Sequence, residues 1–173
     1  MKNFRICLLG PYGFGNIGDE IILEGILTRL KKKYRNPIIF VSSYDPAETT
    51  SKHSRSLAFR MFSYSPLQKI ISLIRVIVVI LKSNALIIGG GSVGALFFEP
   101  EKSLSSRLKS IILSCAWLVL LAKSTGKYVE FHAIGITPSA MWWLTSLALR
   151  LADEVSVRDE FSKEQLPPFV KRR

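Results

Sequence analysis

The feature that most constrains the fold is a regular alternation of short apolar segments with longer segments of helical periodicity. Apolar runs typical of buried strands lie at 4–9, 37–43, 85–88, 128–134 and 154–157. Helical patterns lie at 19–33, 67–81, 105–123 and 139–152, and a last helix is expected from about Asp159 to just before Pro167. This order predicts an α/β fold, a Rossmann-like three-layer sandwich in which a parallel sheet of about five strands has helices on both faces.

Two features of the chain lie outside this alternation. Segment 49–64 has no clear period, and we expect a loop with an irregular helix there. Cys7 and Cys115 lie inside apolar runs far apart in sequence, which favours small core side chains over a disulfide framework or a zinc site. With only two histidines in the chain, a multi-histidine metal site is not expected.

The loops that follow the predicted strands contain the polar chemistry. Right-handed crossovers bring the carboxyl ends of parallel strands to one edge of a sheet, where ligands bind. The loops expected at this edge are 10–18, 43–49, 89–94, 135–139 and 158–159, and they are rich in Gly and Asp. We therefore expect a single functional edge.

The first of these loops has two interpretations. Residues 13–18 match G-x-G-x-x-G between a strand and a helix, the context of a dinucleotide site, and the start of a helix favours an anion. However, Asp19 and Glu20 place two carboxylates where a pyrophosphate would lie, and no acid stands at the spacing of about 20 residues that contacts a ribose. The alternative is a tight turn that leads into an acidic first helical turn.

Five segments, taken in order, resemble the motifs of one family. They are GPYGFGNIGDEIILEGIL, SSYDPAET, ALIIGGGSVG, FHAIGITP and VSVRDEFS, and they extend from about residue 5 to residue 166. In these segments the chain is similar to the polysaccharide pyruvyl transferase family. It departs from the family pattern at Ile134 and Thr137, where Gln and Gly are common, and at Leu96, where an acid is common.

The resemblance implies transfer of a pyruvyl group from phosphoenolpyruvate to two hydroxyls of a cell-surface glycan, forming a ketal. It also implies one half of a two-domain glycosyltransferase fold, with the active site between the halves. Residues 1–166 then form the N-terminal Rossmann-like domain, and 167–173 form a basic tail. The main donor-binding cations and the histidine acid of the family are expected in an absent C-terminal domain, so we expect an incomplete or inactive transferase unless a second chain supplies that half.

The motifs give a set of candidate site residues. Asp19 is the candidate catalytic base, and its alternative role is to cap the following helix. The candidate substrate-binding residues are Gly13, Gly15, Asn16, Gly18, Asp45, Gly90, Gly91, Ser92, His132, Gly135 and Arg158. No metal and no cofactor is expected, because phosphoenolpyruvate is the donor substrate in this family.

Several of these residues have structural alternatives. Asp45 fits an Asp-Pro turn, and the glycines of 89–92 fit close packing of a strand against a helix. His132 fits a core or edge histidine with its hydrogen bonds satisfied. Arg158 and Asp159 fit an ion pair or a helix cap.

The chain is strongly basic, with 24 Lys and Arg against 13 Asp and Glu and a net charge of +11. No acid lies between Glu48 and Glu99, where the cations are Lys52, Arg55, Arg60, Lys69, Arg75 and Lys82. This balance suits an anionic glycan or a phospholipid surface. No nucleic-acid partner is expected, because no helix-turn-helix, zinc-finger or RNA-recognition motif accompanies the charge.

Three apolar runs, at 70–81, 111–122 and 141–152, are shorter than the roughly 20 residues of a membrane span. We expect them to be buried helices, and a helix lying on a membrane surface is the alternative. The chain is thus expected to be a cytoplasmic protein that acts on a glycan or lipid-linked sugar, with peripheral membrane contact left open. The other functional hypotheses are a non-catalytic module that binds a glycan or a membrane surface, and a dinucleotide-dependent enzyme.

Overall fold

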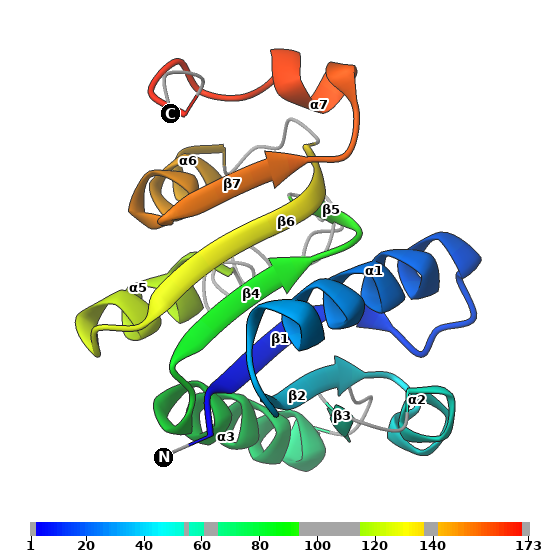
Figure 1. The fold of residues 1–173 in the computed structure, drawn as a ribbon. Coiled ribbons are helices and arrows are strands. Elements are labelled where there is room, and N and C mark those ends of the chain that lie inside the picture. The colour runs from blue at the N-terminus through cyan, green and yellow to red at the C-terminus, as the bar shows by residue number, and fades with distance from the viewer. Residues whose placement is uncertain (1–2, 54–55, 61–65, 94–114, 137–141, 171–173) are drawn as a thin grey trace.

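The structure, a computed structural model, describes residues 3–53, 56–60, 66–93, 115–136 and 142–170 (Figure 1). The strands are β1 (Arg5–Tyr12), β2 (Ile38–Ser43), β3 (Ser56–Arg60), β4 (Ala85–Gly89), β5 (Ser92–Val93), β6 (Tyr128–Ile136) and β7 (Glu154–Val157). The helices are α1 (Ile17–Lys33), α2 (Pro46–Lys52), α3 (Pro66–Lys82), α5 (Cys115–Ser124), α6 (Trp142–Leu151) and α7 (Glu160–Glu164).

The strands form one parallel sheet in the order β3-β2-β1-β4-β6-β7, and the short β5 continues the pairing with β6 beyond the end of β4. This is the strand order of the doubly wound Rossmann fold, in which the direction of winding reverses between the first and fourth strands. The predicted α/β class and parallel sheet are confirmed, and the sheet has more strands than the five or so expected. The reversal between β1 and β4 marks the place where such folds bind ligands.

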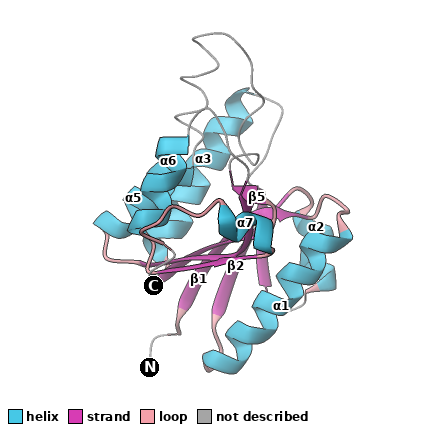
Figure 2. Ribbon diagram, turned by 90° about the horizontal axis from the view of Figure 1, so that it is seen from above, coloured by secondary structure: helices cyan, strands magenta, loops and turns pink. Residues whose placement is uncertain are grey.

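Helices cover both faces of the sheet. Figure 2 shows α1 and α2 on one side and α3, α5 and α6 on the other. The core on the α1 side centres on Ile6, Leu8, Tyr12, Leu23, Ile26, Leu27 and Ile39, and the core on the other side centres on Cys7, Val76, Ile80, Leu86, Val119, Val129 and Phe131. Successive residues of β1 enter opposite cores, so β1 is buried on both faces, as its unbroken apolar run predicts.

The expectation of a loop with an irregular helix at 49–64 is right for the helix but misses a strand. Helix α2 and strand β3 occupy the described part of this segment, and β3 pairs with β2 at the edge of the sheet. The sequence pattern is weak because β3 is an edge strand in which Phe59 is buried while Leu57 and Arg60 are exposed. The turn expected at Asp45 is the start of α2, where the Asp45 carboxylate accepts the N–H groups of Ala47 and Glu48.

Other boundaries differ from those predicted by small amounts. Helix α1 begins at Ile17 rather than Asp19, and β6 continues to Ile136. Two predicted helices begin outside the described residues. The described part of the helix predicted at 105–123 is α5, and the described part of the helix predicted at 139–152 is α6. No described helix is long and apolar enough to cross a bilayer.

Both cysteines are buried and unpaired, as predicted. Burial raises the pKa of the Cys7 thiol well above its usual range and raises the pKa of Cys115 to about 12. A thiol with a raised pKa is a poor nucleophile, so these side chains act as small core residues.

Burial on the inner side of α3 predicts an asymmetric response to alanine. Ile80 is fully buried, whereas Ile74 has an exposed fraction of 56%. Ile80→Ala is expected to lower the free energy of unfolding by about 2–5 kcal/mol through lost burial and a residual cavity, and Ile74→Ala to change it by less than about 0.5 kcal/mol. Urea unfolding measures both values, and equal losses for the two variants would contradict the placement of α3.

Candidate functional site

The loop between β1 and α1 is built around two glycines with positive φ. Gly13 has φ +71° and Gly15 has φ +80°, a region that side chains rarely adopt. A side chain at Gly13 would also meet the hydroxyls of Ser43 and Thr49. Asn16 then caps α1, because its side-chain oxygen accepts the N–H of Gly18 at 3.0 Å. Gly18 therefore lies in the first helical turn, and the loop itself requires glycine at 13 and 15.

Asp19 joins the loops that leave the two central strands. Its side chain is largely buried, with Oδ1 accepting the backbone N–H of Gly91 at 3.1 Å and Oδ2 accepting Nδ2–H of Asn16 at 2.9 Å. The interpretation of Asp19 as the helix cap is wrong, because Asn16 has that role. Instead Asp19 connects α1 to the end of β4 across the point where the winding reverses.

A second set of contacts holds the glycine loop from the side of α2. The Glu20 carboxylate accepts the N–H of Gly13 through Oε1 at 2.8 Å, and its Oε2 lies 3.3 Å from Nε2 of His53. The other ring nitrogen of His53, Nδ1, lies 2.8 Å from Oε2 of Glu24. Sequence reasoning missed this cluster, because no motif links Glu20 to a histidine 33 residues away. The Gly13 N–H is consequently already bonded to a carboxylate.

The end of β4 packs tightly against α1 and β1. A side chain at Gly89 would approach Cδ1 of Ile26 to 2.6 Å, and the Gly89 carbonyl accepts the Tyr12 hydroxyl at 2.7 Å. Gly90 and Gly91 follow with φ values of +73° and +68°. The packing alternative for these glycines is therefore confirmed for Gly89, while Gly90 and Gly91 turn the backbone at the sheet edge beside Asp19.

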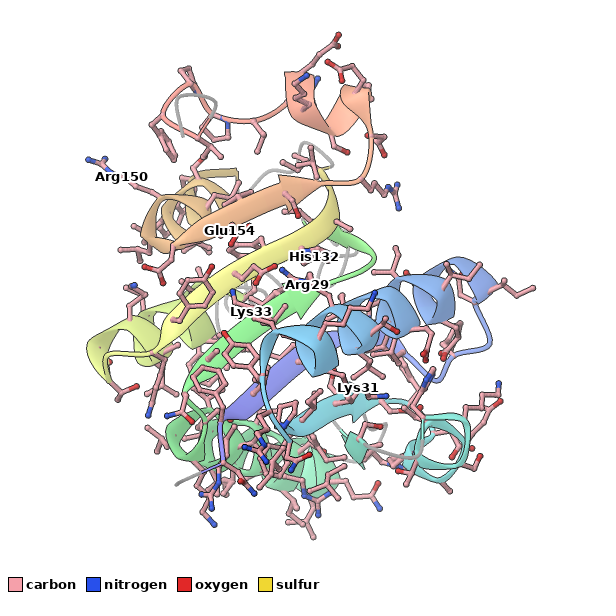
Figure 3. The ribbon with its side chains drawn as sticks, in the orientation of Figure 1. Arg29, Lys31, Lys33, His132, Arg150 and Glu154 are labelled. Atoms are coloured by element: carbon pink, nitrogen blue, oxygen red, sulfur yellow. The ribbon has the colours of Figure 1, made fainter. Side chains whose placement is uncertain are left out.

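The neighbouring strand β6 presents a charged group that the sequence analysis did not identify. Glu130 is buried, and its Oε1 accepts from Nη2 of Arg29 at 2.6 Å and lies 3.0 Å from Nδ1 of His132. Figure 3 shows Arg29 on α1 and His132 on β6 close to each other. Nδ1 of His132 also lies 3.4 Å from the Ser156 hydroxyl. His132 is partly exposed, and its Nδ1 side is held by a carboxylate and a hydroxyl.

The charge state of Glu130 follows from these contacts. Burial by itself would raise the pKa of Glu130, but the hydrogen bonds from His132 and Arg29 and the charge of Arg29 outweigh it and leave the pKa below its usual range. The buried carboxylate is therefore ionised at neutral pH, with Arg29 as its partner.

The far end of the edge is formed by Gly135, Arg158 and Asp159. A side chain at Gly135 would lie 2.8 Å from Cζ of Arg158, so glycine makes room for this guanidinium group. Nε of Arg158 donates to Oδ2 of Asp159 at 2.9 Å, and Asp159 caps α7 by accepting the N–H of Ser162. The bonds from Ser162 and Arg158 lower the pKa of Asp159 to about 2. The predicted ion pair and helix cap are both confirmed.

The structure brings most of the predicted residues to the carboxyl edge of the sheet. One group comprises Gly13, Gly15, Asn16, Gly18, Asp19, Gly90 and Gly91, with Asp45 beside Gly13. A second group comprises His132, Gly135 and Arg158 on β6 and the end of β7. Ser92 lies in β5, but its side chain is outside the described residues.

Comparison with known proteins identifies the family. The family model for polysaccharide pyruvyl transferase matches residues 16–167, from the cap of α1 to just beyond α7. The chain belongs to the polysaccharide pyruvyl transferase family. The match confirms the resemblance seen in the sequence, and it includes Asn16, Asp19, the glycines after β4 and the Arg158–Asp159 pair. Neither the curated proteins nor the solved structures gave a match.

The depressed pKa of Glu130 predicts a pH-dependent loss of stability. Glu130→Gln is expected to lower the free energy of unfolding by about 1–3 kcal/mol at pH 7, because the bonded charge is lost. Since folding lowers this pKa, the contribution is present above the usual value of 4.5 and disappears as the pH falls through the lower folded value. The difference in stability between wild type and variant should therefore shrink below pH 4.5.

Urea unfolding at a series of pH values measures this difference. Glu48→Gln is the matched control, because Glu48 pairs with Lys52 at the surface, where solvent screens the charges and the pair should contribute little to stability. A difference for Glu130→Gln that stays constant from neutral to acid pH would show that the charge of Glu130 is not the source of its stabilisation.

Proposed function

We propose that this member of the polysaccharide pyruvyl transferase family transfers a pyruvyl group from phosphoenolpyruvate to two hydroxyls of a glycan sugar, forming a ketal. The proposal rests on the family match together with the Asp19 bridge at the reversal point of the sheet. The carboxyl edge at this point is where doubly wound folds bind their ligands. The site therefore lies between the loop after β1 and the loop after β4.

The chemistry at this edge favours the sugar over the phosphate. Asp19, Glu20 and Asp45 carry carboxylates beside the glycine loop, and carboxylates accept hydrogen bonds from hydroxyls but repel anions. Asn16 adds an exposed amide. We assign the acceptor sugar to this group, with Asp19 as the candidate base for an acceptor hydroxyl.

The anionic donor requires cations and N–H donors. Within the described edge, the side chain of Arg158 is about half exposed and lies at the end of β7. The proposed donor position is near Arg158 and His132, and a second domain or chain would supply further cations. Preorganised N–H groups and cations would stabilise the phosphate as it leaves.

The proposed transfer conserves all atoms and electrons. The C–O bond between the enol carbon and the phosphate breaks, and two C–O bonds form from that carbon to the two sugar oxygens. The two sugar hydroxyls lose two protons in total. One proton is taken up where the methylene group becomes a methyl group, and the other leaves with inorganic phosphate. No oxidant or reductant is consumed.

A dinucleotide enzyme fits the glycine loop less well. The N–H of Gly13 donates to Glu20, and the N–H of Gly91 donates to Asp19. A pyrophosphate at this loop would have to displace two carboxylates from backbone N–H groups and tolerate their charge nearby. The acidic loop therefore supports the transferase proposal.

The transfer proposal predicts phosphate release that depends on an acceptor sugar. The chain is incubated with phosphoenolpyruvate and a panel of methyl hexosides, alone and with a candidate second-half chain, and phosphate and ketal products are measured. Asp19→Asn is expected to lower the rate at least about tenfold through loss of the base. Glu154→Gln is the control, because Glu154 begins β7 at the opposite edge of the sheet (Figure 3).

Other outcomes separate the hypotheses. Sugar binding by calorimetry with no phosphate release under either condition would indicate a non-catalytic binding module. Tight binding of a nicotinamide dinucleotide, with no sugar binding, would contradict the proposal.

A further inference from the structure

Helix α3 exposes an apolar stripe along its outer side. Six large apolar side chains of this helix have exposed fractions between 39% and 68%, and we call them the α3 stripe: Leu67, Ile70, Ile71, Ile74, Val78 and Leu81. Apart from the adjacent pair Ile70 and Ile71, they recur at intervals of three and four residues, so they lie on one side of the helix. Exposed apolar residues scattered singly are ordinary, but a contiguous row marks an interaction surface.

The inner side of α3 is already used by the core. Ser72, Val76 and Ile80 are buried and recur every four residues, so they face the sheet. The helix is thus apolar on both its inner and its outer side. A helix that is apolar all round is normally covered all round, so the α3 stripe calls for a covering surface beyond the core.

The surroundings of the stripe are cationic. Arg75 and Lys82 are exposed on the same helix and lie along one border of the stripe. Arg5 is next to the end of α3, because its backbone pairs with Asn84, two residues after Lys82. Arg60 is exposed at the end of the neighbouring edge strand. The sequence contains no Asp or Glu between Glu48 and Glu99, so no carboxylate from that segment offsets these charges.

We propose that the outer side of α3 docks on an anionic membrane surface. Helix α3 would lie in the plane of the interface, with the α3 stripe among the acyl chains and the flanking cations at the lipid headgroups. At 17 residues it is about 25 Å long and lies along the surface rather than across it. A second copy of the chain fits this surface poorly, because two cationic stripes would face each other.

The docked orientation leaves the sheet edge accessible. Helix α3 lies in the layer opposite α1 (Figure 2), whereas the Asp19–Gly91 bridge is made by α1 at the carboxyl edge. The inference is independent of the proposed reaction, since it uses no residue of the candidate site. It would bring a lipid-linked sugar and that site to the same membrane surface.

The test is co-sedimentation with vesicles of phosphatidylcholine alone and of phosphatidylcholine mixed with phosphatidylglycerol. We expect binding to the mixed vesicles only, and weaker binding at high salt. Ile74→Asp in the α3 stripe is expected to weaken binding at least about tenfold, and Arg75→Gln about fivefold, since each basic residue near such a surface contributes about 1 kcal/mol. Ile21→Asp is the matched control, because Ile21 is exposed to a similar degree on α1 in the opposite layer.

The remaining outcomes decide against the proposal. Absence of wild-type binding to the mixed vesicles overturns it, and so does equal binding by wild type and Ile74→Asp. Light scattering is run in parallel, and a dimer that Ile74→Asp dissociates would assign the α3 stripe to a second copy of the chain instead. Thermal unfolding followed by circular dichroism confirms that each variant is folded.

Discussion

The arrangement of the candidate site depends on one buried carboxylate. The loops that leave β1 and β4 lead to opposite faces of the sheet, because the winding reverses between these strands. The bond from the Tyr12 hydroxyl to the Gly89 carbonyl links the ends of the two strands, and a second contact links the loops beyond them. Asp19 makes this second contact by accepting the N–H of Gly91 from one loop and the side chain of Asn16 from the other. The shape of the edge therefore depends on a charged hydrogen bond in a largely buried position.

Carboxylates also bind backbone N–H groups elsewhere along this edge of the sheet. Glu20 binds the N–H of Gly13, and Asp159 binds the N–H of Ser162. In each case a carboxylate occupies a backbone donor that an anionic ligand would otherwise use. The loop after β1 therefore has carboxylates at its backbone N–H groups, and at the other end of the edge Arg158 is paired with Asp159.

Sequence patterns predicted the parts of this arrangement that are local. The apolar run of β1, the helical spacing in α1 and the glycines after β1 and β4 each reflect a backbone requirement within a few residues. The prediction that these loops lie at one edge of the sheet used the right-handed connections between parallel strands.

Contacts between distant segments could not be read in this way. Arg29 and Glu130 form an ion pair although they are 101 residues apart, and neither lies in a motif. The edge strand β3 has too little burial to leave a clear alternation. The outer side of α3 is a third example. Its apolar residues predict a buried helix, but the sequence does not show which side of the helix the core covers. Only the three-dimensional arrangement separates the side that faces the sheet from the side that does not.

The most direct test of the central claim is an amide NMR titration of the chain with methyl hexosides and then with phosphoenolpyruvate. If Asp19 organises a sugar site between the loops, the sugar should shift the amide signals of Gly15, Asn16, Gly90 and Gly91, and Asp19→Asn should abolish these shifts. Shifts confined to the groove of about 270 Å³ at the opposite end of the molecule, lined by Lys31, Asn36, Pro37 and Ile39, would contradict this account.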